Sequence, residues 1–174
     1  MPFRTVLMRC LLAATLCLAG AAGASEPRPA ADLDFASLPL QQAIKLVHGN
    51  GRRRLALFSD PDCRYCQRLE RDTLSRLDDV TIYVFLFPLD QHDDAARKAR
   101  LIWCAPDRAG AWDRWMRDGQ LPQAGVCLPP LAANRKLGEA LGVRATPTLV
   151  LPQGQLLPGA VDLATLEHRL RDGP

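Results

Sequence analysis

The sequence predicts an α/β fold, with a central β-sheet covered by helices in one domain. Two apolar runs, residues 55–58 and 80–87, have the composition of buried strands, and the second is apolar on both faces. Segments with apolar residues at helical spacing separate and follow these runs. Near the C-terminus, two further short apolar runs bracket Pro152-Gln153-Gly154, which is a hairpin-turn signal. Strands that alternate with helices are typical of an α/β domain.

Residues 1–24 have the pattern of a signal peptide that is removed on export. Arg4 and Arg9 supply a positive start, and residues 11–22 form an apolar run that is too short to span a bilayer. Ala22-Gly23-Ala24 is a small-residue cleavage site before Ser25. The alternative is an uncleaved membrane anchor. We expect an exported, periplasmic protein.

The composition of the remaining chain gives no sign of a nucleic-acid or membrane partner. Without residues 1–24 there are 20 basic and 19 acidic residues, so neither a nucleic acid nor a membrane surface is indicated. About 150 residues are enough for one domain with its own core. The cysteine count falls from six to four, because Cys10 and Cys17 lie in the leader. Four thiols in an oxidising compartment favour disulfide chemistry.

The segment of residues 25–53 is predicted as an N-terminal tail followed by a helix, ahead of a domain at 54–174. Residues 25–33 are polar and contain proline, as a loose lead-in does. Leu40, Ala43, Ile44 and Val47 then fall on one face of a helix that ends at residues 49–51. Three arginines follow at 52–54; we interpret them as a solvated rim rather than an anion site.

The stretch of residues 55–69 organises the rest of the chain. The apolar run 55–58 is followed by Ser59-Asp60-Pro61-Asp62, which are turn residues, and then by Cys63-Arg64-Tyr65-Cys66 at the start of a helical pattern. This order places Cys63 at a helix N-terminus, where unpaired N–H groups and the helix dipole favour a thiolate. Cys66 lies one helical turn further on, within disulfide reach.

The later elements follow from pattern and turn residues. Pro88 ends the strand at 80–87, and Asp162 caps a final helix that turns Leu163, Leu166 and Leu170 inward. Further helices are predicted at 90–103, 111–116 and 131–141, and strands at 148–151 and 155–157.

Three groups of residues carry a resemblance to a known family. They are FSDPDCRYCQRLE at 58–70, the later cysteines Cys104 and Cys127, and Ala145-Thr146-Pro147-Thr148. From about residue 55 to 170 the chain resembles the catalytic domain of the thiol:disulfide interchange proteins DsbC and DsbG, in the thioredoxin superfamily. The resemblance implies a thioredoxin fold with a helical insertion after the second strand.

The resemblance assigns roles to the first cysteine pair. Cys63, facing outward, is the expected nucleophile, and the more buried Cys66 resolves the mixed disulfide. Arg64 and Tyr65 between them help to set the redox poise, and the tyrosine matches DsbC-like proteins. Thioredoxins and DsbA-like oxidases carry a buried acid six residues before the first cysteine, where this chain has Leu57.

Magnitudes show that the helix dipole alone cannot activate Cys63. A dipole contribution of about 0.3–1 kcal/mol is less than one pKa unit, which is about 1.4 kcal/mol. Hydrogen bonds from the N–H groups around Tyr65 and Cys66 are therefore needed. Asp60 and Asp62 are expected to oppose the thiolate as like charges.

The resemblance also implies roles for the remaining motif residues. Pro147 is expected to be a cis proline that faces the Cys-x-x-Cys pair, and Thr146 to offer its backbone to an extended substrate segment. Cys104 and Cys127 correspond to the family's structural disulfide. Longer family members carry an N-terminal dimerisation domain, for which residues 25–54 leave no room, so we expect a monomer with a weaker isomerase activity.

The function expected from these residues is reduction or isomerisation of disulfides in exported proteins. No cofactor is needed, and the resemblance implies a membrane reductase of the DsbD type as partner. One alternative is a DsbA-like oxidase, and another is a metal-binding or chaperone module. A four-cysteine zinc site is disfavoured by the wide spacing of Cys104 and Cys127. The histidines, His48, His92 and His168, are expected to be solvated, and the three tryptophans to pack in the core or the insert.

Overall fold

The computed structural model describes residues 33–123 and 125–171. The predicted signal peptide at 1–24 lies outside the described residues. Within the described ranges, no helix has the length and apolar character needed to cross a membrane.

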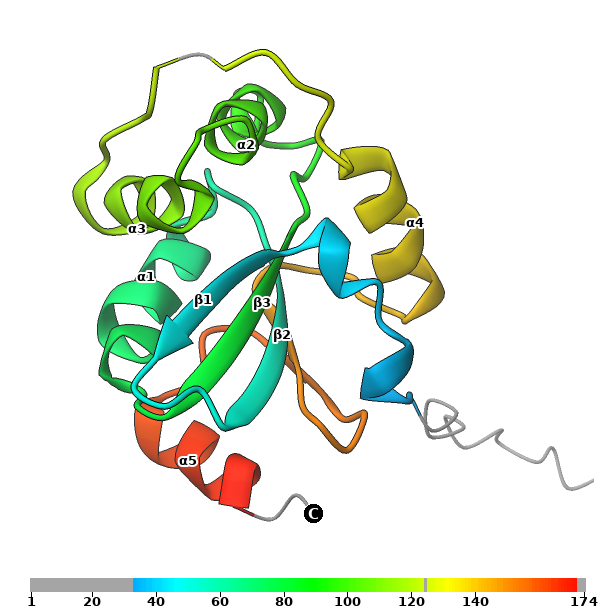
Figure 1. Ribbon diagram of the computed structural model, residues 1–174. Helices are drawn as coiled ribbons and strands as arrows, with labels where there is room; N and C mark the ends of the chain where they lie inside the picture. The colour runs from blue at the N-terminus through cyan, green and yellow to red at the C-terminus, as the bar shows by residue number, and fades with distance from the viewer. Residues whose placement is uncertain (1–32, 124, 172–174) are drawn as a thin grey trace, which may run out of the picture.

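A five-stranded mixed sheet forms the centre of the fold (Figure 1). Its spatial order is β1-β3-β2-β4-β5. β2 and β3 are parallel, and every other neighbouring pair is antiparallel. The strands are β1 Ile44–His48, β2 Arg53–Ser59, β3 Val80–Leu86, β4 Thr148–Val150 and β5 Leu156–Pro158. The α/β thioredoxin-like fold predicted from sequence is confirmed.

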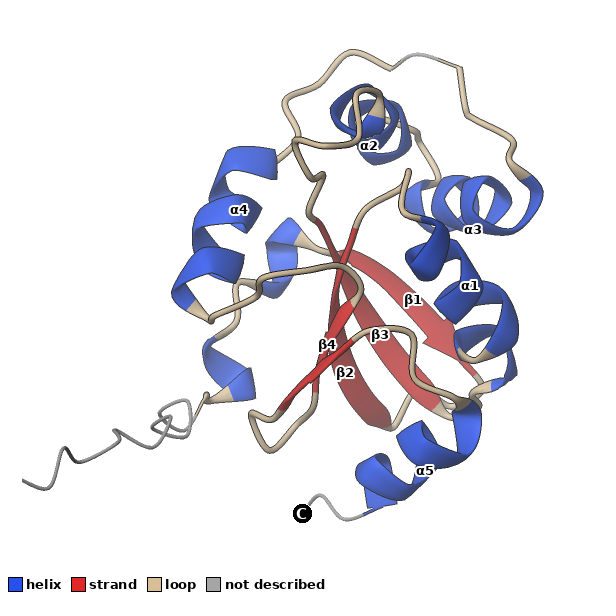
Figure 2. Cartoon of the chain, turned by 180° about the vertical axis from the view of Figure 1, so that it is seen from behind, coloured by secondary structure: helices blue, strands red, loops and turns tan. Residues whose placement is uncertain are grey.

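Helices cover both faces of this sheet. In Figures 1 and 2, α1, α3 and α5 lie on one side of the sheet and α4 on the other. The α-helices are α1 Arg64–Asp72, α2 Ala95–Trp103, α3 Arg108–Asp118, α4 Leu131–Ala140 and α5 Leu163–Arg171. Short 3-10 turns are found at Phe35–Ser37, Leu40–Gln42 and Leu74–Arg76. Of the predicted helices, the one at 90–103 begins later, at Ala95, because residues 90–94 form turns instead.

Side-chain alternation along β2 divides the interior into two cores. Leu55 and Leu57 pack in the core under α1, α3 and α5, whereas Ala56 and Phe58 pack in the core under α4. This period of two is the signature of a strand that is covered on both faces. The second core is aromatic: the rings of Phe58 and Phe85 stack with their centroids 5.1 Å apart.

The helix predicted from Leu40, Ala43, Ile44 and Val47 is wrong. Residues 40–42 form only one 3-10 turn, and residues 44–48 form β1, which pairs antiparallel with β3. Within β1, Ile44 and Leu46 are buried while Lys45 and Val47 are exposed. The same apolar residues fit a helical and a strand period, and pairing with β3 decides between them. The segment therefore joins the sheet of the domain instead of preceding it.

The helical insertion follows β3 and runs through α2, α3 and α4 before the chain re-enters the sheet at β4. It comes after the third strand of the chain, not the second, because β1 adds a strand that the sequence did not predict. A disulfide joins Cys104, at the end of α2, to Cys127 in the loop before α4, with Cα atoms 5.5 Å apart. This pairing is the one that the family resemblance implied.

Candidate active site

The two remaining cysteines lie where β2 gives way to α1. Cys63 is the N-cap residue of the helix, with an extended backbone (φ −79°, ψ 116°), and Cys66 lies in its first turn. The Thr146–Pro147 peptide bond is cis, as the resemblance implied. It directly precedes β4, whose Thr148 is paired with Phe58 of β2. This pairing brings the proline loop and the cysteine turn to the same end of the sheet.

Both sulfurs are more enclosed than the sequence suggested. Cys63 was expected to face outward, yet only 5% of its surface is exposed, and Cys66 is completely buried. The proline loop causes this burial, since the Cys63 thiol donates a hydrogen bond to the carbonyl oxygen of Thr146 at 3.5 Å. The exposed side chains at the turn are those of Arg64 and Tyr65, and Tyr65 is 49% exposed.

Hydrogen bonds to the sulfur make Cys63 acidic. The thiol of Cys66 is the largest cause, and together with the N–H groups of Cys66 and Tyr65 and the hydroxyl of Thr146 it lowers the pKa of Cys63 to about 5, against the opposing effect of burial. The N–H groups of Cys66 and Tyr65 contribute, as predicted from the size of the dipole effect, but the Cys66 thiol contributes more. At neutral pH Cys63 is therefore a thiolate.

Cys66 has the opposite character. Burial, followed by its hydrogen bond to Cys63, raises the pKa of the Cys66 thiol far above its ordinary value. The hydroxyl of Ser59 and the N–H of Asp60 face this sulfur and favour its thiolate. The site thus pairs an ionised sulfur with a protonated one, which is the arrangement that an attacking and a resolving thiol require.

The side chains of the two intervening residues contact each other. The guanidinium of Arg64 donates to the Tyr65 hydroxyl at 3.1 Å and lies 4.9 Å from the centre of its ring. The Arg64 guanidinium is thus engaged by the Tyr65 ring and hydroxyl, and both residues are exposed.

The two aspartates before Cys63 do not act as free negative charges, contrary to the sequence-based expectation. Asp60 is fully buried, and its carboxylate lies 2.8 Å from Nδ1 of His92. Asp62 forms an ion pair with Lys98 of α2. His92, expected to be solvated, is instead half-buried beside the cysteine turn. His48, on β1, is also half-buried, and its Nδ1 lies 3.0 Å from the carbonyl oxygen of Leu77.

Helix α3 holds the cysteine turn and α1 in place. The indole N–H of Trp115 donates to the carbonyl oxygen of Pro61 at 2.6 Å, and the ammonium of Lys98 lies 4.8 Å from the centre of the Trp115 ring. Trp112 donates to the buried carboxylate of Glu70 at 2.7 Å. The sequence placed the tryptophans in packing roles only. A buried indole N–H needs a hydrogen-bond acceptor, so the tryptophans themselves indicated that such contacts would form.

A four-cysteine zinc site is not formed, because the disulfide leaves only Cys63 and Cys66 free among the described cysteines. In the described part of the chain, no cluster of three or more His, Cys, Asp or Glu side chains could hold a metal ion.

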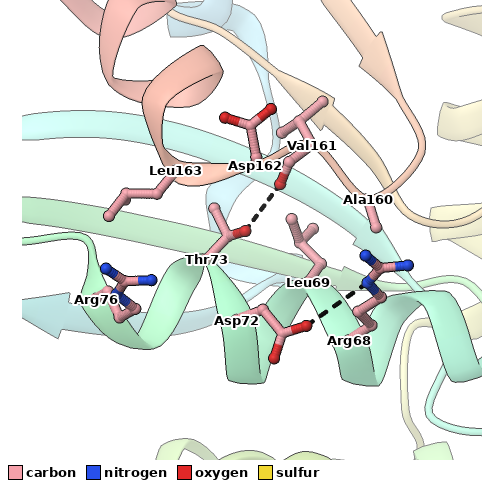
Figure 3. Close-up of a pocket in the computed structure, with 9 residues that line it drawn as sticks. All are labelled: Arg68, Leu69, Asp72, Thr73, Arg76, Ala160, Val161, Asp162 and Leu163. Atoms are coloured by element: carbon pink, nitrogen blue, oxygen red, sulfur yellow. Dashed lines mark hydrogen bonds and ion pairs between the residues drawn. The ribbon is translucent and has the colours of Figure 1, made fainter.

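A surface cavity lies away from the sulfurs, between the C-terminal half of α1 and residues 160–163 (Figure 3). Its walls include Arg68 and Asp72, which form an ion pair at 3.5 Å, and Thr73, whose hydroxyl donates to the Val161 carbonyl at 2.8 Å. Neither cysteine nor the proline loop lines it.

Comparison with known proteins places this site among disulfide exchange proteins. The model of the thioredoxin-like domain family matches residues 40–174. A Bordetella avium protein named "Probable thiol:disulfide interchange protein DsbC" is 44% identical over 138 residues, which cover 79% of this chain and 49% of the relative. Thiol:disulfide interchange protein DsbC of Escherichia coli is 34% identical over 107 residues, covering 60% of this chain and 45% of the relative. The chain thus spans about half the length of the curated relatives it matches.

A solved structure agrees with these matches over nearly its whole length. The crystal structure of a disulfide interchange protein from Neisseria gonorrhoeae superimposes with a TM-score of 0.73 at 47% identity, covering 77% of this chain and 96% of that one.

Proposed function

The chain belongs to the thioredoxin-like domain family, and from this premise we propose that it catalyses thiol–disulfide exchange in proteins through Cys63 and Cys66. One observation carries the proposal: two adjacent sulfurs have opposite protonation at neutral pH, because the pKa of Cys63 is lowered to about 5 and that of Cys66 is raised. The ionised sulfur attacks, and the protonated one waits until the first bond has formed.

The proposed reaction begins with the Cys63 thiolate. It attacks one sulfur of a substrate disulfide, the substrate S–S bond breaks, and the second substrate sulfur leaves as a thiolate. A mixed disulfide now joins Cys63 to the substrate. If a substrate thiolate displaces Cys63, the substrate disulfide has been isomerised and the pair stays reduced. If Cys66 loses its proton and displaces the substrate, the substrate is reduced by two electrons and a Cys63–Cys66 disulfide remains.

Thr146 and Pro147 are proposed to bind the substrate next to the reacting sulfur. The carbonyl oxygen of Thr146 lies 3.5 Å from the Cys63 sulfur, so a chain lying beside this loop is within reach of the nucleophile. An extended segment that pairs through its backbone with this loop would be bound without regard to its particular sequence. We infer that the substrates are varied proteins with exposed disulfides.

We further propose a periplasmic location, a reductase or isomerase role, a monomeric state and re-reduction by a membrane thiol reductase of the DsbD type. The leader-like residues 1–24 support export. The similarity to proteins named DsbC supports the role and the reductase partner.

Reduction of insulin and refolding of a scrambled disulfide protein test this function. Cys63→Ser is expected to abolish both activities, whereas Cys66→Ser is expected to accumulate mixed disulfides through Cys63. A double Cys104→Ser, Cys127→Ser variant is the matched control, because it removes two cysteines without touching the reacting pair. Full activity of the Cys63→Ser variant would rule the proposal out.

An oxidase role is the second candidate, and the acidity of Cys63 favours it. A stabilised thiolate stabilises the reduced pair, which makes the disulfide form a stronger oxidant. The redox potential of the pair, together with its redox state in cells, distinguishes the two directions. A strongly oxidising potential with a disulfide at rest supports the oxidase, and a resting dithiol supports the reductase or isomerase.

A further inference from the structure

Asp60 is a buried carboxylate that joins the cysteine turn to the segment after β3. One of its oxygens accepts a hydrogen bond from the Asp62 N–H at 2.6 Å, and the other accepts one from the Leu89 N–H at 2.7 Å. Its own backbone carbonyl accepts a hydrogen bond from the Cys63 N–H at 3.2 Å. The Asp60 carboxylate is thereby held in the turn that leads into Cys63, where a negative charge would disfavour a thiolate.

His92 is the cationic group placed to compensate that charge. Its Nδ1 lies 2.8 Å from the second carboxylate oxygen of Asp60, and 27% of its side chain is exposed. The imidazole therefore connects a fully buried carboxylate to solvent. Burial of an unpaired carboxylate is costly, and an imidazolium at hydrogen-bond distance offsets much of that cost.

The other charges around His92 are partly paired with each other. Asp62 of the cysteine turn is bound by Lys98 of α2, and Asp90 on the same segment as His92 is bound by Arg135 of α4. Asp93 and Arg135 line the shallow surface cavity that His92 also borders. The hydrogen bond that His92 donates to Asp60 raises the pKa of His92, and the charges of Asp60, Cys63 and Asp62 raise it further against the effect of burial.

We propose that His92 is a positioning residue for disulfide exchange: as an imidazolium it neutralises Asp60 and so preserves the thiolate of Cys63. His92 touches neither sulfur and acts through the carboxylate. This inference rests on the proposed function, because it concerns the same sulfur pair. Coupling between two ionisable groups is reciprocal, so the thiolate that favours the imidazolium is itself favoured by it.

The consequence is a dependence of the thiol chemistry on one proton outside the pair. When His92 loses its proton, Asp60 carries an uncompensated charge beside Cys63, and the thiolate becomes less stable. The reduced pair is then less favoured, so its redox potential becomes more negative.

Titration of the Cys63 thiolate by its ultraviolet absorbance, in the full chain, tests this inference. In H92Q, which keeps a hydrogen-bonding side chain without the charge, the midpoint is expected to rise by about 0.5–1 pH unit. H92K retains a positive charge and is expected to stay near the wild-type midpoint. In the D60N background, the additional H92Q change is expected to have less than half of that effect. His48→Gln is the matched control and is expected to change nothing.

Each outcome decides a separate claim. An unchanged midpoint in H92Q, or an equal rise in H92Q and H92K, overturns the role of His92 while the proposed function stands. An equal H92Q shift with and without Asp60 overturns the route through the carboxylate. A wild-type protein whose Cys63 titrates as a free thiol and which reduces no insulin overturns the proposed function itself.

Discussion

Trp112 of α3 donates its indole N–H to the carboxylate of Glu70 on α1, at 2.7 Å, in the interior beside the cysteine-bearing helix. Burial raises the pKa of Glu70 to about 7, although the Trp112 hydrogen bond acts in the opposite direction. A carboxyl group with this character makes folding stability depend on pH.

We predict that Glu70→Gln changes the pH dependence of stability. The pKa of Glu70 in the folded state lies above the ordinary value of 4.5. Below pH 4.5 the carboxyl is protonated in both the folded and the unfolded state and does not reduce the free energy of unfolding. Between pH 4.5 and about 7 only the unfolded state loses the proton, so the free energy of unfolding falls as the pH rises. At one pKa unit per about 1.4 kcal/mol, the cost approaches about 3 kcal/mol at alkaline pH. Gln keeps an acceptor for Trp112, so the stability of the variant relative to wild type is expected to rise across this range.

Urea unfolding at a series of pH values measures this difference. Any constant cost of burying the amide cancels in the comparison between pH values. Glu139→Gln, an exposed change on α4, serves as the control. A stability difference between Glu70→Gln and wild type that is flat with pH would show that the buried carboxyl does not titrate in this range.

The Thr146 hydroxyl gives a second prediction. It is buried and has no well-formed hydrogen bond within the described residues, yet the Thr146 side chain is among the causes that lower the pKa of Cys63. Thr146→Val removes the hydroxyl and keeps the shape of the side chain. We expect the Cys63 titration midpoint to rise by several tenths of a pH unit, with little loss of stability.

Thr148→Val, at the start of β4 directly after the proline loop, is the control. The Thr148 hydroxyl donates to the Ala145 carbonyl at 2.7 Å rather than to a sulfur. This variant is expected to lose about 1 kcal/mol of stability and to leave the Cys63 midpoint in place. If both variants shift the midpoint equally, the effect comes from loop geometry and not from the Thr146 hydroxyl.

Arg64 lies next to Cys63 in sequence, yet we predict that Arg64→Ala barely alters its titration. The Arg64 guanidinium packs on the Tyr65 ring and donates a hydrogen bond to the Tyr65 hydroxyl. It is also exposed to solvent, which screens its charge. The same spectroscopic titration, carried out at low and high salt, measures the effect. A large rise of the midpoint at low salt that disappears at high salt would show that Arg64 does stabilise the thiolate.

The sequence was sufficient for the centre of the fold and for the position of Cys63 and Cys66 at the start of α1. An apolar run, turn residues and the Cys-x-x-Cys spacing together require a strand, a tight turn and a helix N-terminus, and all three are local features. The Thr-Pro motif and the Cys104–Cys127 pair came from family resemblance, and the structure contains both the cis bond and the disulfide.

The features that the sequence did not reveal depend on contacts between distant segments. β1 was taken for a helix because its apolar residues fit both periods, and only its pairing with β3 selects the strand. The burial of Cys63 depends on the proline loop, 83 residues away along the chain. Asp60 and His92 are 32 residues apart, so neither showed its partner. Polar side chains whose roles arise from such pairing carry no periodic signal.

The pH at which Cys63 ionises is the most direct test of whether this sulfur is a thiolate at neutral pH. Ultraviolet titration of the reduced protein, with Cys63→Ser as the reference, reports the pH at which this sulfur becomes a thiolate. We expect the Cys63 titration to have its midpoint at about pH 5, and Cys66 to remain protonated until the pH is alkaline. A Cys63 midpoint near the ordinary value of 9.0 would contradict this expectation.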